Sequence, residues 1–492
     1  MKRTSLSASD IYTLYRPSAC ERRVYLLAHE TQKAEESEFD KLMKELGARH
    51  ELNHLNSFPS YVDINQGDRE SRITKTLRAI QERKDVIYQG VFEALNPGDD
   101  TLIIGIPDFL IRDGDGYKIR DCKLSRHVGK GRHEEIILQL ELYGWLFEQN
   151  TGSPPTALEV YLGDQSIARL TYNGGTTALS ILRQIQGLRR EASEPYSPVG
   201  WTKCGSCAFR DHCWGLAKQQ QDVALVFGLD QATAIALREQ GVSSIDQLLT
   251  RFDNDSLSEL KKTRGDKMVR VGSGAERILL QAEALTSGKE KLIAPLKLPA
   301  AENLVMFDLE GLPPQFDELD KVYLWGLQVY GSRPGKFMPA VAGFSTYGDR
   351  KGWEDFLGAA ERIFKEHGDI PFIHWANYET TKLKSYISRY GDRNGIAERV
   401  LDNCVDLLII TRDALVLPEY SYSLKVIEKR AGFKRTMKEF GGDWSIVQYI
   451  KAVETEDESL RRAVMEDILR YNEEDLRATW AVFQWLKGKN KT

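Results

Sequence analysis

Hydrophobic and polar positions change their spacing along the chain and set apart a first segment, residues 1–220. This segment opens with apolar residues at helical spacing, continues with short runs of the strand type, and then shows a strongly apolar helical pattern. The predicted elements are helices over 7–28 and 35–55, strands over 86–95, 101–114 and 117–125, and a helix over 134–149. The Gly-Asp-Gly between the last two strands predicts a β-hairpin.

Two further segments follow. Residues 221–295 show no strand pattern and predict a helical linker domain, whose short helices are interrupted by the runs QGVSS and VGSG. Residues 296–492 begin with a buried strand over 303–311, continue with a second over 321–331, and then alternate between strands and helices. Such alternation is typical of α/β domains. We therefore expect an α/β protein with three parts.

The composition is that of a soluble globular protein: 41% of the 492 residues are hydrophobic, 28% are charged, and the formal net charge is −5. A chain of this length usually folds into several domains. No signal-peptide pattern and no membrane-spanning run is found, so we expect a cytoplasmic protein without membrane contact. The net charge argues against a uniformly basic surface, but the Lys- and Arg-rich runs over 120–132 and 261–270 allow local contact with nucleic acid.

Three of the chain's six cysteines fall within ten positions: Cys204, Cys207 and Cys213. In a reducing compartment, clustered thiols bind metal more often than they form disulfides. Cys20, at a predicted helix start, is the candidate for a fourth ligand, whereas Cys122 and Cys404 lie in strand patterns of the buried type. Four thiolates suit either zinc or a [4Fe–4S] cluster. Alternatively, His212 could complete a zinc site with the three clustered thiols.

Two acidic residues and a lysine lie at predicted strand ends of the first segment. Asp108 is predicted to end one strand of the hairpin region, and Asp121 and Lys123 to end the next. Residues two apart on a strand face the same side, and pairing of the strands can bring Asp108 beside the other two. Two carboxylates bind Mg²⁺ through hard oxygen ligands, and an ammonium offsets charge when a phosphodiester is attacked. The three residues form a candidate site for phosphodiester hydrolysis.

His50 precedes these residues on a predicted helix, and Gln139 and Tyr143 follow them on one helical face. Together with the four cysteines, this ordered set resembles the RecB-like branch of the PD-(D/E)xK nucleases, specifically the iron–sulfur members of CRISPR adaptation and helicase–nuclease repair systems. The resemblance covers about residues 10–215. It implies a restriction-endonuclease-like core, metal-dependent DNA cleavage, and a helicase or CRISPR-adaptation partner in trans.

The same resemblance implies roles for the residues of this set. Metal binding would fall to His50, Asp108 and Asp121, and assistance to the attacking water to Lys123. Positioning of DNA would fall to Gln139 and Tyr143. A [4Fe–4S] cluster would be held by Cys20, Cys204, Cys207 and Cys213. Such nucleases commonly act on single strands, often from the 5′ side.

A second set of acids lies in the third segment. Asp308 and Glu310 share one face of a buried strand, where two acids are costly unless a cation pairs with them. Near the C-terminus, Tyr471 precedes Asp475 by about one helical turn, and Glu379 follows a strand end. Metal ions held by several carboxylates are a recurring arrangement for hydrolysing a phosphodiester.

This set resembles the DEDD exonucleases of the RNase H-like fold, in the subgroup with a tyrosine in the last motif, over about residues 300–490. The resemblance implies Mg²⁺ or Mn²⁺ binding by Asp308, Glu310, Glu379 and Asp475, orientation of water by Tyr471, and removal of nucleotides from a 3′ end. One position departs from the family, since Glu379 stands where the second motif normally ends in Asp. Asp406, at a further strand end, is expected to have a structural or supporting role.

The run VGSG resembles the glycine hairpin of helix-hairpin-helix motifs, in which Gly272 and Gly274 would free backbone N–H groups for a phosphate, although a plain spacer fits equally well. We expect a metal-dependent DNA nuclease, an exonuclease that acts on single-stranded DNA at two separate active sites, in DNA repair, phage defence or CRISPR adaptation. The alternatives are a nucleic-acid-binding scaffold with one or both sites inactive, an RNA-processing 3′-exonuclease, and a redox protein. No P-loop is present, so unwinding would require a partner.

Overall fold

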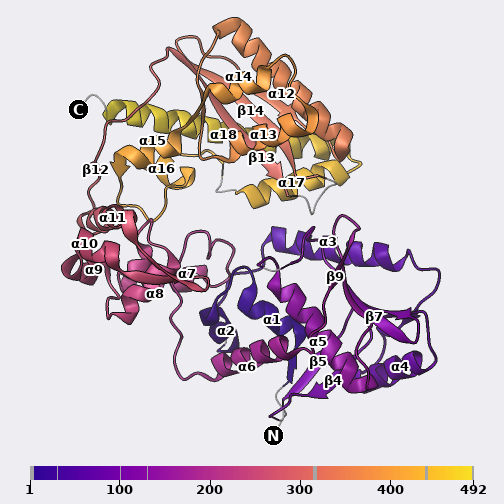
Figure 1. Cartoon of the computed structure of the whole chain (residues 1–492). Coiled ribbons are helices and arrows are strands. Elements are labelled where there is room, and N and C mark those ends of the chain that lie inside the picture. Colours follow the sequence, from indigo (N-terminus) through magenta and orange to yellow (C-terminus); the bar gives the residue numbers. More distant parts are fainter. Residues whose placement is uncertain are drawn as a thin grey trace. The chain divides into compact units, whose positions relative to one another are not determined.

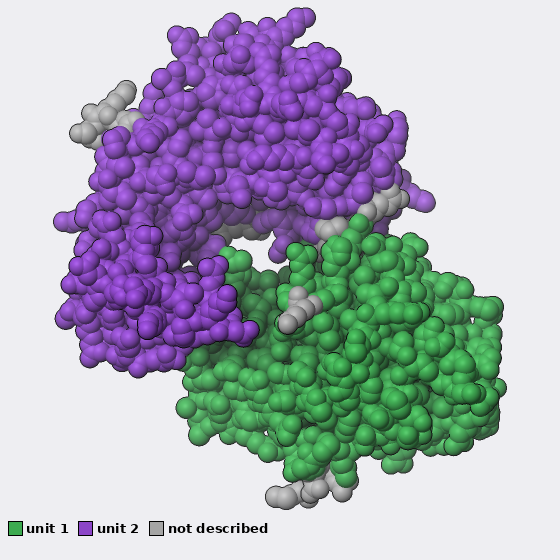
Figure 2. Space-filling model, in the orientation of Figure 1, with its two compact units in different colours: residues 1–197, 202–213 green, residues 198–201, 214–492 purple. Residues whose placement is uncertain are grey.

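A computed structural model of the chain describes residues 5–29, 31–99, 101–129, 131–313, 319–437 and 441–489. The chain divides into two compact units, which Figure 2 shows in different colours. Unit 1 comprises Met1–Ser197 and Thr202–Cys213, and unit 2 comprises Pro198–Trp201 and Trp214–Thr492. The helical middle of the chain therefore groups with the C-terminal α/β part.

Unit 1 is built on a six-stranded mixed sheet in the order β2-β3-β6-β7-β8-β9. Its strands are β2 (Val62–Asp63), β3 (Val86–Tyr88), β6 (Phe109–Asp113), β7 (Gly116–Cys122), β8 (Ala157–Tyr161) and β9 (Ile167–Leu170). The predicted hairpin is confirmed, because β6 and β7 pair antiparallel and Gly114 takes the positive φ, +62°, that a tight turn requires.

A second, three-stranded sheet in unit 1 has the order β1-β5-β4, with β1 at Ser5–Ser7, β4 at Phe92–Leu95 and β5 at Leu102–Gly105. The single strand predicted over 101–114 is therefore wrong, since β5 and β6 belong to different sheets. Pro107 lies at the break and has no N–H to continue a ladder. As a result, Asp108 precedes β6 and does not end a strand.

The helices of unit 1 cover the apolar faces of these sheets (Figure 1). They are α1 (Ala8–Tyr15), α2 (Glu21–Ala28), α3 (Glu38–Leu55), α4 (Arg69–Gln81), α5 (Glu134–Thr151) and α6 (Thr176–Arg190), with α7 (Arg210–Gln219) crossing into unit 2. The helix predicted over 7–28 is two helices, because Pro17 interrupts it. Helix α5 is buried on most sides, as its apolar sequence predicts.

The middle of the chain contains α8 (Gln231–Glu239), α9 (Ile245–Arg251), α10 (Asn254–Glu259) and α11 (Ala275–Ser287). It also contains a hairpin of β10 (Lys261–Arg264) and β11 (Lys267–Arg270), so the prediction of a strand-free segment is wrong. Most strand side chains of this hairpin are exposed, and most are charged, so the apolar alternation that marks a half-buried strand is missing.

The C-terminal part of unit 2 has a five-stranded sheet in the order β15-β14-β13-β16-β17. The strands are β13 (Asn303–Leu312), β14 (Lys321–Gly331), β15 (Met338–Val341), β16 (Phe372–His374) and β17 (Cys404–Asp406), and a separate pair joins β12 (Lys291–Leu292) to β18 (Leu415–Val416). The helices are α12 (Ser345–His367), α13 (Tyr378–Tyr390), α14 (Ile396–Asp402), α15 (Leu407–Ala414), α16 (Leu424–Arg430), α17 (Gly442–Glu454) and α18 (Glu458–Lys489).

Strand β13 separates two apolar layers. On one side Val305 and Phe307 pack in a core with residues of α12, α13 and α14. On the other side Leu304 and Met306 pack with residues of α15, α16 and α18. Because side chains alternate along a strand, Asp308 and Glu310 also face the side of α18.

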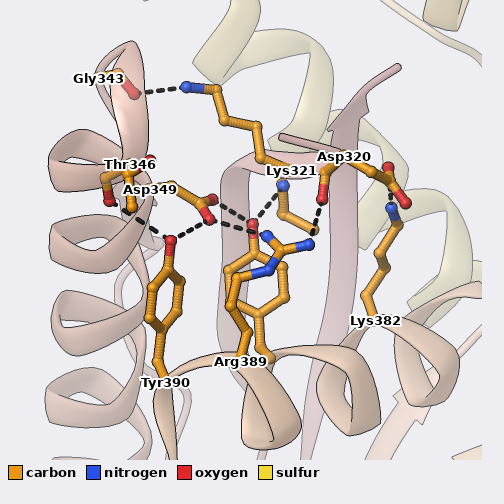
Figure 3. A network of polar contacts seen from close by, with 10 residues as sticks. Asp320, Lys321, Gly343, Thr346, Asp349, Lys382, Arg389 and Tyr390 are labelled. Atoms are coloured by element: carbon orange, nitrogen blue, oxygen red, sulfur yellow. Dashed lines mark hydrogen bonds and ion pairs between the residues drawn. The ribbon is translucent and has the colours of Figure 1, made fainter. Parts of the chain in front are cut away.

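A buried aspartate ties α12 to α13 in the layer opposite α18 (Figure 3). Asp349 is fully buried and accepts hydrogen bonds from the hydroxyls of Tyr386 and Tyr390. Arg389 completes the set with an ion pair of 2.9 Å between its Nη1 and Asp349 Oδ2. A buried carboxylate with three charged or polar donors is satisfied, so this network holds the fold together away from the acidic side of β13.

Candidate active sites

Three carboxylates meet where β13 passes α18. Asp308 and Glu310 come from alternate positions of the strand, and Asp475 comes from the helix. Each offers an oxygen atom, and these atoms lie within 4.8 Å of one another, the only such group of three His, Cys, Asp or Glu ligand atoms among the described residues. Three acidic oxygens at this separation match the ligands that Mg²⁺ and Mn²⁺ prefer.

The pKa values of all three acids are raised, chiefly by burial. Burial, followed by repulsion from Asp475, raises the pKa of Asp308 well above its ordinary value. The same two causes raise the pKa of Glu310 to about 8. Burial also raises the pKa of Asp475. A divalent cation would offset this repulsion, so the donor set fits a metal site.

Neighbouring polar groups hold the acids in place. Asn472 Nδ2 donates to Asp308 Oδ2 at 2.7 Å, and the Tyr323 hydroxyl donates to Glu310 Oε2 at 3.4 Å. Gly326 pairs with Asp308 across the sheet and leaves room for this amide, because a Cβ there would lie 1.8 Å from Asn472 Oδ1. Asn472 is a site residue that the sequence patterns did not indicate.

Tyr471 lies one helical turn before Asp475 and is almost completely buried. Burial, followed by the charge of Asp475, raises the pKa of its hydroxyl well above the ordinary value, so Tyr471 keeps its proton. The Lys425 ammonium lies 5.3 Å from the centre of the Tyr471 ring. The tyrosine can therefore donate a hydrogen bond beside the three acids.

Glu379 does not belong to the group of three. It lies at the start of α13 with its Oε2 3.5 Å from Nδ1 of His374, and both side chains are buried. Burial alone would lower the pKa of His374, but hydrogen bonding to Cys404 and Glu379 outweighs burial and raises it to about 10. Glu379 nevertheless contributes to the raised pKa of Asp308, so its charge is felt at the site.

Asp406 has a clear local role. Its Oδ1 accepts from the backbone N–H of Leu408 at 2.9 Å and of Ile409 at 3.2 Å, which caps α15.

Unit 1 brings together the acids predicted there. Asp121 of β7 forms an ion pair with Lys123, and Asp108 Oδ2 accepts from the backbone N–H of Cys122 at 2.7 Å. Burial, followed by repulsion from Asp121, raises the pKa of Asp108 well above its ordinary value. Burial would lower the pKa of Lys123, but Asp121 and other neighbours raise it, so the ammonium stays charged. Two carboxylates, the buried Asp121 and the partly buried Asp108, thus share one site with a lysine.

Gln139 and Tyr143 extend this site along α5. Gln139 Nε2 donates to the Tyr143 hydroxyl at 2.9 Å, and Gln139 Oε1 accepts from the Tyr12 hydroxyl at 2.8 Å. The charges of Asp121 and Asp108 both raise the pKa of Tyr143, after burial. Burial raises the pKa of Tyr12 to about 12. Tyr12 comes from α1 and was not indicated by the sequence.

Glu51, and not its neighbour His50, is joined to Asp108 by hydrogen bonds. Gln89 Nε2 donates to Glu51 Oε1 at 2.7 Å and also lies 3.3 Å from Asp108 Oδ1. Gln89 has a φ of +54°, an uncommon backbone conformation that places its side chain between the two acids. His50 Nε2 lies 3.3 Å from the Tyr161 carbonyl, and the two rings stack.

Two protein-family models match separate parts of the chain. Residues 14–214 match the PD-(D/E)XK nuclease superfamily, and residues 305–487 match the RNase H superfamily. The chain combines a PD-(D/E)XK nuclease domain with an RNase H-like domain. The first contains Asp108, Asp121 and Lys123, and the second contains Asp308, Glu310 and Asp475. Domains of both superfamilies indicate a nuclease, that is, a hydrolase of nucleic acid.

Other comparisons add little. No curated protein matches the chain. A solved structure described as "Crystal structure of SSO0001" is 16% identical, covers 34% of this chain and 94% of that chain, and has a TM-score of 0.19. That score is too low to support a shared fold. No helix in the described part of the chain is long and apolar enough to span a membrane.

The four cysteines predicted to act together all belong to unit 1, which contains the PD-(D/E)XK domain. Cys20 is the N-cap of α2, and Cys204, Cys207 and Cys213 lie in and before α7. Cations lie among them: the thiols of Cys20, Cys204 and Cys207 interact electrostatically with Arg23, and those of Cys20, Cys204 and Cys213 with Lys203. Cysteines from distant parts of the sequence thus interact with the same two cations, Arg23 and Lys203.

The spacing of these sulfur atoms does not match a zinc site in this structure. A single zinc ion holds thiolates at about 2.3 Å, which keeps the sulfur atoms within about 4 Å of one another. No three of the four cysteine sulfurs, all in described residues, lie within 4.8 Å of one another. His212 is paired instead with Glu194, at 3.2 Å. Among the described residues, the four cysteines therefore form no clear metal or cluster site.

Proposed function

We propose that this protein is a Mg²⁺- or Mn²⁺-dependent exonuclease that degrades single-stranded DNA at two separate active sites, one in each nuclease domain. The observation that carries the proposal is the close group of Asp308, which is partly buried, and Glu310 and Asp475, which are buried; a divalent cation would offset the repulsion among them. Bound there, the metal would activate water and stabilise the leaving oxygen of the phosphodiester.

In the RNase H-like domain, Asp308, Glu310 and Asp475 are the proposed metal ligands. Tyr471 keeps its proton and would orient the attacking water by donating or accepting a hydrogen bond. Glu379 Oε2 lies 3.5 Å from Nδ1 of His374. Glu379 would therefore have to break this ion pair before it could bind the metal. We therefore assign Glu379 a weaker, supporting part in metal binding.

In the PD-(D/E)XK domain, Asp108 and Asp121 are the proposed metal ligands, with His50 as the third expected from the resemblance. Glu51 is an additional candidate, because Gln89 links it to Asp108. Lys123 would stabilise the charge that develops on the phosphate, since it stays protonated beside Asp121. Gln139 and Tyr143, joined to Tyr12, would position the DNA strand.

The same domain is proposed to hold a [4Fe–4S] cluster on Cys20, Cys204, Cys207 and Cys213. Arg23 and Lys203 support this assignment, because nearby cations offset the negative charge of a thiolate-bound cluster. We further propose a cytoplasmic role in DNA repair, phage defence or CRISPR adaptation, with a helicase or an adaptation protein as partner in trans.

The proposal is tested with linear single-stranded DNA, a circular single strand of the same sequence and matched RNA. The full chain is expected to degrade the linear DNA with Mg²⁺ or Mn²⁺, to spare the circle, and to stop in EDTA. The double variant Asp121→Asn, Asp308→Asn should lose at least about 10³-fold in rate, because each site loses a charged ligand. Asp355→Asn, a half-exposed acid on α12, is the matched control and should keep full rate.

Two results would overturn the proposal. One is metal-dependent cleavage by the folded double variant, which would place the chemistry elsewhere. The other is the absence of DNA cleavage by the wild-type chain under all metal conditions, which would leave a nucleic-acid-binding scaffold. Preference for the RNA would favour the RNA-processing alternative.

A further inference from the structure

Arg435 is held beside the acids of the RNase H-like domain, although it comes from an irregular segment between α16 and α17. Its Nε and Nη2 each donate to a different carboxylate oxygen of Glu428 at 2.8 Å. The same Nη2 donates to Asp475 Oδ1 at 2.5 Å. Such a forked contact fixes the plane of a guanidinium far better than a single contact.

The segment that carries Arg435 is itself anchored to α18. The backbone N–H of Thr436 donates to Glu474 Oε1 at 2.7 Å, and Glu474 is almost completely buried. Glu474 is the residue before Asp475, so the arginine and the acid group are fixed to the same turn of helix. The position of the guanidinium is therefore set by the fold.

One nitrogen of this arginine has no acceptor. The Arg435 side chain is only 10% exposed, and its Nη1 is buried. Among the described residues, this nitrogen has no hydrogen-bond partner. A buried donor without an acceptor destabilises the folded protein, because it has lost its hydrogen bonds to water. Native proteins rarely tolerate this cost, and an orphaned donor at a site often indicates an acceptor that a ligand supplies.

The acceptor has to be compatible with the charges already present around Arg435. Arg435 already pairs with Glu428, and its Nη2 contacts Asp475 of the acid group, whose negative charge would repel any anion approaching without a counter-charge. A phosphodiester oxygen meets these conditions once the acids have bound their cation. The described carboxylates nearest in the contacts of Arg435 already have partners, since Glu428 and Asp475 accept from Arg435 and Glu474 accepts from Thr436.

We propose that Arg435 is a catalytic residue of the RNase H-like domain, whose Nη1 donates to a non-bridging oxygen of the scissile phosphate, and that Glu428 is a positioning residue that holds the guanidinium in place. The inference rests on the proposed nuclease function. In the reaction, a water oxygen bonds to phosphorus and the P–O3′ bond breaks. One water proton goes to the departing 3′ oxygen and the other to solvent, while Arg435 keeps all its protons.

The test is steady-state 3′ trimming of 5′-labelled single-stranded DNA, measured in the Asp121→Asn background so that only the RNase H-like site is read. Arg435→Gln is expected to lower kcat by about 10²- to 10³-fold, the usual effect of removing one donor to a developing oxyanion. Arg435→Lys should recover less than a tenth of that loss, because an ammonium cannot reproduce the fork. Glu428→Gln should give an intermediate loss.

A readout other than turnover separates a catalytic from a merely structural role. Calorimetric affinity for Mn²⁺ should not weaken in Arg435→Gln, whereas Asp308→Asn should lose Mn²⁺ binding. Affinity for thymidine 5′-monophosphate in the presence of Mn²⁺ should fall about tenfold in Arg435→Gln, which corresponds to one lost charge-assisted hydrogen bond. Arg430→Gln is the matched control and should change none of these values, because Arg430 lies on α16 but pairs with Glu419.

Failure of this inference and failure of the proposed function give different results. If trimming depends on Asp308 but Arg435→Gln keeps kcat within twofold, the role of Arg435 is overturned and the nuclease assignment stands. If Asp308→Asn trims normally, the proposed site is wrong. In a chain that does not trim at all, an unchanged affinity of Arg435→Gln for the monophosphate overturns the inference. Should Arg435→Gln fail to fold, the neutral pair Glu428→Gln, Arg435→Gln replaces it in every measurement.

Discussion

Glu310 is held between two acids in a buried position, and this has a consequence for stability. Its pKa is raised from 4.5 to about 8, first by burial and then by Asp475. Between these two values the folded protein keeps a proton on Glu310 that the unfolded chain releases. Because the folded state binds more protons, the free energy of unfolding decreases as the pH rises through this range.

Glu310→Gln should therefore stabilise the metal-free protein at pH 8.5 and have much less effect at pH 4.5. The expected gain is a few °C in the melting temperature of unit 2, measured in EDTA across a pH series. Glu361→Gln, on the half-exposed surface of α12, is the control and should leave the curve unchanged. A Glu310→Gln protein with the same pH dependence as wild type would show that Glu310 is not repelled by its neighbours.

Some site residues follow from the sequence and others do not, for a physical reason. Asp308 and Glu310 share a strand face, and Tyr471 and Asp475 share a helix face, so the periods of 2 and 3.6 residues reveal each pair. Asn472 contacts Asp308 only because α18 packs on β13. Contacts of that kind, and those of Tyr12 and Glu51 in unit 1, depend on tertiary packing that no local period records.

At the scale of elements, the sequence predicted the strands and helices that bury a continuous apolar face. It did not predict the exposed hairpin or the break within the strand expected over 101–114. β13, β14 and α5 were found because each buries a continuous apolar face. The break between β5 and β6 carried a signal in Pro107, which cannot continue a ladder. The hairpin of β10 and β11 carried none, because most of its side chains are exposed and its sequence has no apolar alternation.

The four cysteines lie on elements that are distant in sequence, α2, the segment that leads into α7, and α7 itself. If they hold a [4Fe–4S] cluster, anaerobically purified protein should be brown and contain about four irons per chain. Cys20→Ser should lose the iron as completely as Cys207→Ser, because each thiolate binds one corner of the cluster. The measurement is iron content together with visible absorbance.

Cys404→Ser is the matched control for this experiment. Cys404 lies on β17 in the other unit and should not affect the iron content. Colourless protein with one zinc per chain would contradict the cluster assignment. Iron retained by Cys20→Ser would remove Cys20 from the ligand set.

At the scale of the whole molecule, each compact unit contains one candidate site and its own core. The PD-(D/E)XK residues Asp108, Asp121 and Lys123 belong to unit 1, and the RNase H-like residues Asp308, Glu310 and Asp475 belong to unit 2. No residue of one set is shared with the other. Loss of one site should therefore leave the chemistry of the other intact.

The measurement that tests this claim most directly follows linear single-stranded DNA labelled at its 5′ end or at its 3′ end, with wild type, Asp121→Asn, Asp308→Asn and the double variant. We predict that wild type trims both ends, that Asp308→Asn loses only 3′ trimming, that Asp121→Asn loses only 5′ trimming, and that the double variant trims neither. Loss of both activities in one folded single variant would contradict two independent sites.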